Sequence, residues 1–257
     1  MPPPLPPWLG GLLGCLLEVG ALLGVRQALK RGGLRRKVAD TPTSLIRSAA
    51  MGPVELKGQA RLGDPAAAAP FSGRPCCWWR VTVEEERVTR TRNGESHEWV
   101  QIHAEACQAP FALDDGTGRV DVDPQGAEVR APRALEFVSA GVGLANLFGG
   151  GAPAALAPQA MGWIQSGLFA SRRRLREWRV DEGRPLYALG VLRPRHSADG
   201  QPLGPALEQG RQGEPFLLST DSEEDLLKSL GWAEAFWLGL ALAAAGLGAW
   251  LLQMAWV

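Results

Sequence analysis

The residues best suited to chemistry are two histidines and a cysteine that lie close together in the sequence. His97, His103 and Cys107 lie in or directly beside one segment, 98–106, that alternates as a β-strand does. Alternate residues of a strand share a face, so both histidines face one way if no bulge intervenes. Such a set would suit a Cys/His nucleophilic site or a metal site. The sequence offers no third ligand or orienting partner, and we interpret both histidines as surface or core residues.

Of the remaining cysteines, the adjacent pair in the middle of the chain is predicted to have a structural rather than a reactive role. Cys76 and Cys77 are adjacent, and vicinal cysteines form strained disulfides, so we expect buried structural thiols rather than a redox pair. The chain has four cysteines and no CxxC pattern, which disfavours a disulfide framework, and the low cysteine count excludes a multi-cysteine zinc site. We therefore predict no catalytic residue, no metal and no cofactor. A thiol-dependent enzyme that uses Cys107 and His103 is the weakest hypothesis we keep.

Two clusters of charged residues are predicted to be structural. The run 114–118, Asp-Asp-Gly-Thr-Gly, resembles a calcium loop but lacks the later glutamate and the spacing, which favours a tight turn. The acidic run 84–86 lies in the same predicted hairpin as three arginines, and we expect cross-strand ion pairs between them on a solvated face. The arginines are Arg87, Arg90 and Arg92. The chain has no phosphate-cradling loop and no GxSxG elbow.

The overall charge is balanced, with 27 Lys and Arg against 27 Asp and Glu and a formal net charge of zero. Proteins that bind nucleic acids usually show a basic domain or stripe, so we predict no nucleic-acid partner. The 257 residues would suffice for one or two globular domains, but apolar segments at both ends commit part of the chain to a membrane.

The first predicted structural element is an apolar segment near the N-terminus. Residues 8–25 are apolar except for Glu18, and at about 1.5 Å per residue they just cross a hydrocarbon core of about 30 Å. A cleaved signal peptide needs a basic start, whereas here the basic residues follow the apolar run, so we predict a retained transmembrane helix over 8–29. Glu18 is either functional or a protonated or helix-paired carboxylate. The basic residues are Arg26, Lys30, Arg31, Arg35, Arg36 and Lys37.

The C-terminal segment gives the strongest signal in the sequence. Residues 236–257 carry no ionisable side chain and are long enough to span a bilayer. We predict a second transmembrane helix over 233–257. Four tryptophans lie near its two ends, where an aromatic belt would place them. They are Trp232, Trp237, Trp250 and Trp256.

The basic residues beside the helices determine the predicted orientation. They lie on the domain side of the first helix, and neither outer terminus carries a basic side chain, so we predict a two-pass integral membrane protein with a cytoplasmic domain. The lipid bilayer is thus a predicted partner. Four basic residues are candidates for contact with anionic head groups, at about 1 kcal/mol each, and a stop-transfer flank alone is the alternative. The four are Arg31, Arg35, Arg36 and Lys37.

The segment between the helices, residues 40–230, has the pattern of short antiparallel strands. Asn93-Gly94 is its strongest hairpin signal, because both positions tolerate positive φ. We expect a short helix over 44–51, and over 134–170 either two short helices or a segment that dips into the membrane surface. The predicted fold class is α+β, an antiparallel β-rich domain (small barrel or curled sheet) with a few helices, flanked by two transmembrane helices. The predicted strands include 54–60, 77–91, 98–106, 110–113, 119–124, 187–192 and 214–219.

The order of these features resembles the GIDE family, also called the beside-a-membrane (BAM) domain, which is best known from a mitochondrial ubiquitin ligase. The resemblance covers residues 5–257. It rests on the order of several short motifs between two membrane helices, since no single motif is diagnostic. The motifs are TPTSLIRSAA (41–50), GPVELKG (52–58), SGRPCCWW (72–79), PFALDDGTG (110–118) and FLLS (216–219).

The resemblance implies ubiquitin transfer, which the eukaryotic ligase performs with a RING finger after its second helix. A RING needs eight Cys and His ligands for two zinc ions, whereas this chain has seven, scattered and without zinc spacing. We therefore expect a RING-less membrane-anchored binding or scaffold module for an unknown protein or lipid partner. E3 ubiquitin-protein ligase-like activity, with a RING from a partner, is the alternative. The resemblance also implies a domain on the periplasm-like side, opposite to the side that the charges predict.

Overall fold

The chain forms two compact units, a helical unit from Met1–Pro42 and Ser222–Val257 and a β-rich unit from Thr43–Asp221. The computed structural model describes residues 6–91, 94–139, 156, 157, 160, 162, 172–196, 199, 201–211 and 214–255. The helices are α1 (Pro7–Asp40), the 3₁₀ helix η1 (Ile46–Ser48) and α3 (Glu223–Ala255). The strands are β1 (Thr43–Ser44), β2 (Gly52–Arg61), β3 (Ala67–Ala68), β4 (Pro75–Cys76), β5 (Trp78–Thr91), β6 (Gly94–Ala106), β7 (Phe111–Asp114), β8 (Arg119–Val122), β9 (Glu128–Arg130), β10 (Arg133–Val138), β11 (Arg173–Val180), β12 (Pro185–His196), β13 (Pro202–Glu208) and β14 (Leu217–Ser219).

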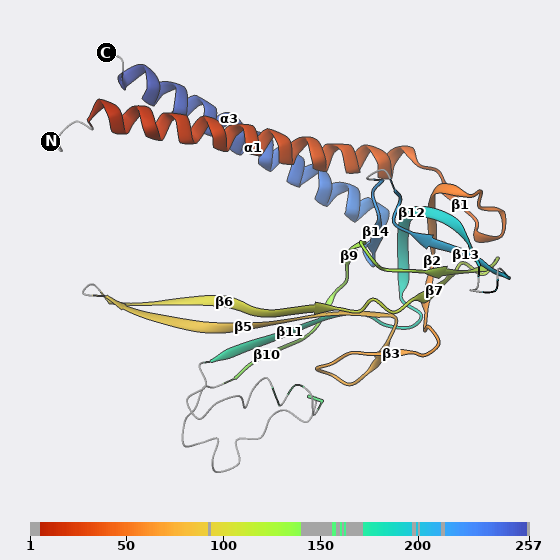
Figure 1. Ribbon diagram of the computed structural model, residues 1–257. Helices are drawn as coiled ribbons and strands as arrows, with labels where there is room; N and C mark the ends of the chain where they lie inside the picture. Colours follow the sequence, from red (N-terminus) through yellow and green to blue (C-terminus); the bar gives the residue numbers. More distant parts are fainter. Residues whose placement is uncertain are drawn as a thin grey trace, which may run out of the picture. The chain divides into compact units, whose positions relative to one another are not determined.

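The helical unit consists of α1 and α3, which run antiparallel side by side (Figure 1). Both helices are long and apolar enough to cross a membrane. α1 ends where the backbone N–H and the Oγ1 of Thr41 both donate to the Lys37 carbonyl, at 3.2 and 2.7 Å, and Pro42 follows. α3 begins after Ser222, whose Oγ accepts from the Asp225 backbone N–H at 3.2 Å and donates to its carboxylate at 2.7 Å. This arrangement resembles a capping box.

The centre of the β-rich unit is a closed barrel of five strands. β2 pairs with β7, β7 with β8, β8 with β13, β13 with β12, and β12 pairs back with β2. Each of the five strands contributes a fully buried side chain to one common core. These side chains are Leu56, Leu113, Val122, Ala188 and Leu207. The structure confirms the predicted antiparallel β-rich fold and its barrel form.

The barrel has the connectivity of an OB-type fold. β2, β7 and β8 form an antiparallel meander, β12 and β13 form an antiparallel pair, and β13 runs parallel to β8. β12 closes the barrel by pairing antiparallel with β2 over eight residues, from Pro185↔Gln59 to Leu192↔Gly52. Greek-key barrels of this kind use closure to avoid exposed strand edges.

A second, four-stranded antiparallel sheet has the order β10-β11-β5-β6 and is built from two insertions into the barrel (Figure 1). The hairpin β5–β6 lies between barrel strands β2 and β7 in the sequence, and β10 and β11 lie between β8 and β12. Its own small core contains Phe71, Val81, Val83 and Leu175. The predicted hairpin is confirmed, although Asn93 at its turn lies outside the described residues.

Three segments differ from the expectation. The helix expected over 44–51 is replaced by β1, which pairs parallel with β2 at Thr43↔Glu55 and Ser44↔Leu56, and by the short η1. Where helices were expected over 134–170, β10 extends to Val138 and pairs with β11, and most of the remainder lies outside the described residues. The arginine run from Arg173, which is not among the predicted strands, forms β11, an inner strand of the second sheet.

Candidate membrane-interface site

The contact between α1 and α3 is lined by small residues. From Gly10 to Gly32, the buried positions of α1 recur at spacings of three, four and seven residues, as in a coiled-coil seam. Helices packed in lipid favour small residues there, because small side chains let the two backbones approach closely. The buried small residues of α1 are Gly10, Gly14, Ala21, Gly24, Ala28 and Gly32, and those of α3 are Ala241 and Gly248.

The close approach leaves little room for larger side chains. A methyl group on Gly24 would lie 3.0 Å from the Cβ of Ala241. A methyl group on Gly248 would lie 2.9 Å from the Glu18 Oε1, so the Glu18 side chain packs directly on Gly248. This contact places Glu18 between the helices and favours its interpretation as a helix-paired carboxylate.

An ion pair joins the helices beyond their apolar parts. The Arg35 Nε lies 3.3 Å from Glu234 Oε2, and both side chains are partly exposed. Glu234 packs over Gly32, where a methyl group would lie 2.5 Å from its Oε1. The Arg35 Nη1 lies 3.5 Å from where a Cβ on Gly231 would be. Two glycines, one on each helix, therefore let this pair sit close to both backbones.

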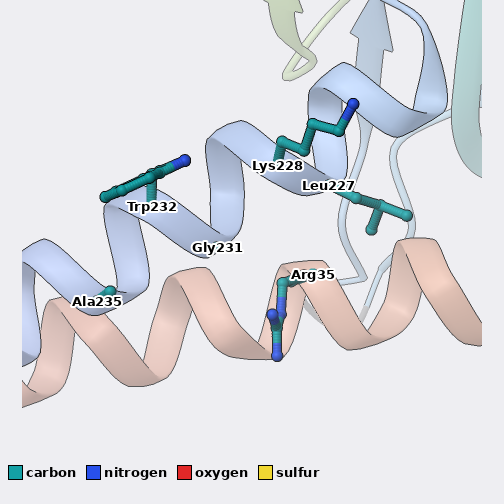
Figure 2. Close-up of a pocket in the computed structure, with 6 residues that line it drawn as sticks. All are labelled: Arg35, Leu227, Lys228, Gly231, Trp232 and Ala235. Atoms are coloured by element: carbon teal, nitrogen blue, oxygen red, sulfur yellow. The ribbon is translucent and has the colours of Figure 1, made fainter.

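Beside this ion pair lies a shallow surface groove of about 520 Å³, which we call the juxtamembrane groove. Figure 2 shows Arg35 from α1 and the other lining side chains from α3. Two lining residues are cationic and none is acidic, and Trp232 is 79% exposed. The lining residues are Arg35, Leu227, Lys228, Gly231, Trp232 and Ala235.

The structure separates the four basic candidates predicted from sequence. Arg35 lines the juxtamembrane groove, whereas Arg31, Arg36 and Lys37 lie elsewhere on α1. Sequence reasoning missed Lys228, which is isolated in an acidic segment of the chain. Only the antiparallel register of the helices, with Arg35 next to Gly231, shows that Lys228 belongs with the basic residues of α1.

Cys76 and Cys77 are buried, as expected, and Cys107 is buried as well, whereas Cys15 on α1 is exposed. Burial raises the pKa of Cys76 and of Cys77 from 9.0 to about 12, and it also raises the pKa of Cys107. Cys77 and Cys107 belong to the barrel core. His103 instead pairs with Glu105 at 3.4 Å on β6. A buried, protonated thiol is a poor nucleophile, so this geometry disfavours the thiol-dependent hypothesis.

The histidines do not form the face that the simple alternation would give. The register between β5 and β6 shifts at Ile102, so a bulge lies between His97 and His103. His97 Nδ1 lies 3.2 Å from Glu86 on the neighbouring strand. Within the part of the chain that the structure describes, no group of three or more His, Cys, Asp or Glu side chains could hold a metal ion.

A buried carboxylate network holds the loop that carries the SGRPCCWW motif. Glu177 is fully buried, and its Oε2 accepts from the backbone N–H groups of Phe71 and Ser72 at 2.9 and 3.0 Å. Its Oε1 accepts from Ser72 Oγ at 2.6 Å and from Arg179 Nη1 at 3.3 Å. Arg179 also donates to Asp181. Because every carboxylate oxygen of Glu177 is bonded within the network, its role is to fix the loop on β11.

The run 114–118 is a tight turn, as predicted. The Asp115 carboxylate accepts from the backbone N–H groups of Ile46, Thr117 and Gly118 and from the Thr117 hydroxyl. Burial opposes ionisation of Asp115, but these hydrogen bonds outweigh it and hold its pKa below the usual value. The carboxylate oxygens serve the turn and η1 rather than a calcium ion.

The ion pairs of the second sheet differ from the prediction. Glu84 pairs with Arg174 and Arg176, and Glu85 pairs with Arg173 at 3.1 Å. These arginines belong to β11, not to the hairpin, because β11 pairs with β5 from Arg173↔Glu85 to Val180↔Trp78. Of the three hairpin arginines, Arg90 pairs with Glu95. The expectation was wrong because it considered only the neighbours nearest in sequence.

Comparison with known proteins gives a match to a family. The model of the GIDE family, described as E3 ubiquitin ligase, matches residues 80–252. No curated protein and no solved structure matches the chain. The matched part runs from β5 into α3 and includes the α3 side of the juxtamembrane groove, whereas Arg35 lies before it.

Proposed function

The chain belongs to the GIDE family, and from this premise we propose that it is a two-pass membrane protein whose β-rich unit is a binding or scaffold module for a protein partner. The observation that carries the proposal is the pair of long apolar helices, α1 and α3, packed through glycine and alanine. A helix pair that buries its small residues and presents leucines outward is suited to lipid rather than to water.

The proposal assigns no catalytic site to the β-rich unit. Its support is the state of the reactive groups that the structure describes: the thiols are buried, and Glu177 and Asp115 are committed to hydrogen bonds that hold loops. The orderly pairing of glutamates and arginines on the second sheet suits a rigid surface rather than a reactive one.

Membrane anchoring is tested by extraction of isolated membranes with alkaline carbonate. We expect the full-length protein to stay in the pellet and to be released only by detergent. A variant with charged substitutions at Leu22 and Leu242, which are exposed on the two helices, is expected to leave the membrane. Recovery of the unaltered protein in the carbonate supernatant would contradict the anchoring.

We propose that the β-rich unit is cytoplasmic, on the basis of the basic residues that follow the apolar part of α1. The native domain cysteines are buried, so a new thiol is needed to report the side. Gln125 is exposed in the β-rich unit, and Gln125→Cys in a Cys15→Ala background provides it. A membrane-impermeant maleimide is expected to label this variant only in opened cells. Labelling in intact cells would favour the periplasm-like side that the family resemblance implies.

E3 ubiquitin ligase-like activity is the second candidate, because the matching family is described by that activity. The 257 residues contain seven Cys and His, fewer than the eight ligands of a RING, so we propose that any such activity needs a RING from a partner. The purified chain with standard E1 and E2 enzymes is expected to form no ubiquitin conjugates. Conjugate formation by the chain alone would favour the ligase over the scaffold.

A further inference from the structure

We propose that the juxtamembrane groove is a binding site for the phosphate of an anionic phospholipid, held by Arg35 and Lys228 beside Trp232. The inference rests on the proposed membrane anchoring and adds a ligand class and a location to it. Its occupant is a lipid of the bilayer in which the two helices lie, not a soluble phosphate compound.

The depth of the groove suits a lipid head group. Trp232 lies one helical turn, about 5–6 Å, before Phe236, where the uncharged part of α3 begins. The head-group layer on each side of a bilayer is about 5–8 Å thick, and exposed tryptophans favour it. The Arg35 guanidinium lies beside Gly231, the residue before Trp232, and is thus at the same depth.

The charges of the groove suit a phosphate. Arg35 and Lys228 are its only charged lining residues. Glu234 Oε2 lies 3.3 Å from the Arg35 Nε, and this ion pair positions the guanidinium, whose Nη1 lies towards Gly231. A fixed guanidinium is a good partner for phosphate oxygens. The Lys228 ammonium points away from Arg35 in Figure 2, but its stem is flexible, and it adds a second positive charge to the groove. Lys228 has an acidic neighbour, Glu224, but at 3.8 Å on the exposed face of the same helix.

The shape of the groove suits a lipid as well. Gly231 leaves its floor open, because the nearest atoms to a Cβ built there are 3.5 Å away and belong to Arg35. Leu227, Trp232 and Ala235 supply apolar walls. A head group that is charged at one end and continues into an acyl chain fits this mixture of cationic and apolar lining better than a free ion does.

Binding of a lipid in one specific groove can be distinguished from non-specific attraction of anionic lipids by all the basic residues together. In the diffuse case each basic residue near the surface contributes about equally, whichever way it faces. Arg36 is next to Arg35 in sequence, is exposed and does not line the groove. Arg35→Gln and Arg36→Gln therefore remove the same charge at nearly the same depth, and only the first changes the groove.

The test is native mass spectrometry of the full-length protein from micelles that contain equal amounts of phosphatidylglycerol and phosphatidylcholine. We expect the unaltered protein to retain phosphatidylglycerol in preference. Arg35→Gln is expected to lower this preference about fivefold, the factor that corresponds to one basic contact. Gly231→Leu, which fills the groove without changing charge, is expected to lower it similarly, and Arg36→Gln is expected to leave it unchanged.

Three outcomes would overturn the site. Equal losses for Arg36→Gln and Arg35→Gln would show diffuse attraction, and an unchanged preference in both Arg35→Gln and Gly231→Leu would show that the lipid binds elsewhere. Displacement of phosphatidylglycerol by millimolar inorganic phosphate would show a site for free phosphate. These results are separate from carbonate extraction: a protein that stays in the pellet but fails here retains its proposed anchoring and loses only the lipid site.

Discussion

The helical unit and the β-rich unit bury side chains of opposite kinds. In the barrel, large aliphatic side chains such as Leu113 are fully buried, whereas in the apolar parts of α1 and α3 the buried residues are glycines and alanines such as Gly14 and Gly248. The large buried side chains of the helical unit lie outside those apolar parts, at Val38, Leu226 and Leu230. Leu22 and Leu242 in the helices are instead 71% and 74% exposed. In water, burial of large apolar side chains stabilises the fold. In a bilayer, the lipid tails are as apolar as leucine, so only close packing of the helices stabilises their contact. The difference shows that the two units are built for different solvents.

The two units also treat a carboxylate differently. Glu177 in the β-rich unit accepts four hydrogen bonds from three residues, which compensates for its removal from water. Glu18 in the helical unit packs on the backbone of Gly248. The β-rich unit thus uses a hydrogen-bonded carboxyl group to hold a loop, whereas the helical unit accommodates a carboxyl group beside the backbone of a glycine. The same substitution placed in both units should therefore have different effects.

The largest expected difference comes from Leu→Ala. Leu113→Ala should lower the free energy of unfolding by about 2–5 kcal/mol, because it removes buried apolar contacts and leaves a cavity. Leu22→Ala, at an exposed position of α1, should change it by less than about 0.5 kcal/mol. Thermal unfolding of the full-length protein in detergent, followed by near-ultraviolet circular dichroism, measures both. A large effect of Leu22→Ala would mean that this face of α1 is covered.

The buried carboxylate network gives the second test. Glu177→Gln should destabilise the β-rich unit by about 3 kcal/mol, near the lower end for a broken buried pair, because Arg179 keeps Asp181. Glu95→Gln removes an exposed pair with Arg90 and should cost less than about 1 kcal/mol. Limited proteolysis should also cut Glu177→Gln first in the loop at Ser72. Equal stability of the two variants would argue against the loop-fixing role.

Sequence patterns predicted the parts of the fold in which local signals and tertiary contacts agree. The β5–β6 hairpin, β2 and β12 alternate as strands do, and the apolar runs of both helices are unbroken enough to be recognised. β11 was missed because its arginines indicate a solvated segment until β5 supplies the glutamates that pair with them. β13 was missed because Pro202, Gly204 and Pro205 disfavour a strand, and only pairing with β12 and β8 makes it one.

The candidate site was predictable only in part, for a similar reason. The basic run marked Arg35 as a membrane-surface candidate, and the belt pattern marked Trp232. Neither pattern could choose Arg35 over Arg36, because that choice depends on which face of α1 meets α3. Lys228 joins the groove only through the antiparallel pairing of two helices that are far apart in the sequence. Register between distant elements is the information that local patterns lack.

The third test compares two glycines of α3. Gly248→Leu should weaken the helix pair by about 1–3 kcal/mol, since the new side chain meets Glu18. Gly239→Leu should be tolerated, because nothing lies within 4 Å of a Cβ built there. Oxidative cross-linking between Gly24→Cys and Ala241→Cys, with Cys15→Ala, reports the pairing. We expect a lower cross-link yield for Gly248→Leu only. Equal yields in both variants would show that the glycine contact does not hold the helices together.

The smallest effect at neutral pH should come from the thiols, because their contribution to stability changes only at alkaline pH. Folding raises the pKa of Cys76 and Cys77 from 9.0 to about 12 by burial, so the folded state favours the protonated thiol. Below pH 9 the stabilisation is fully present. Above it, the unfolded chain loses these protons first, and stability should fall by up to about 1.4 kcal/mol per pH unit for each thiol. Cys77→Ala should make this decline shallower, whereas Cys15→Ala in the helical unit should not. An equal slope in Cys77→Ala and the unaltered protein would contradict a buried, protonated thiol in the barrel core.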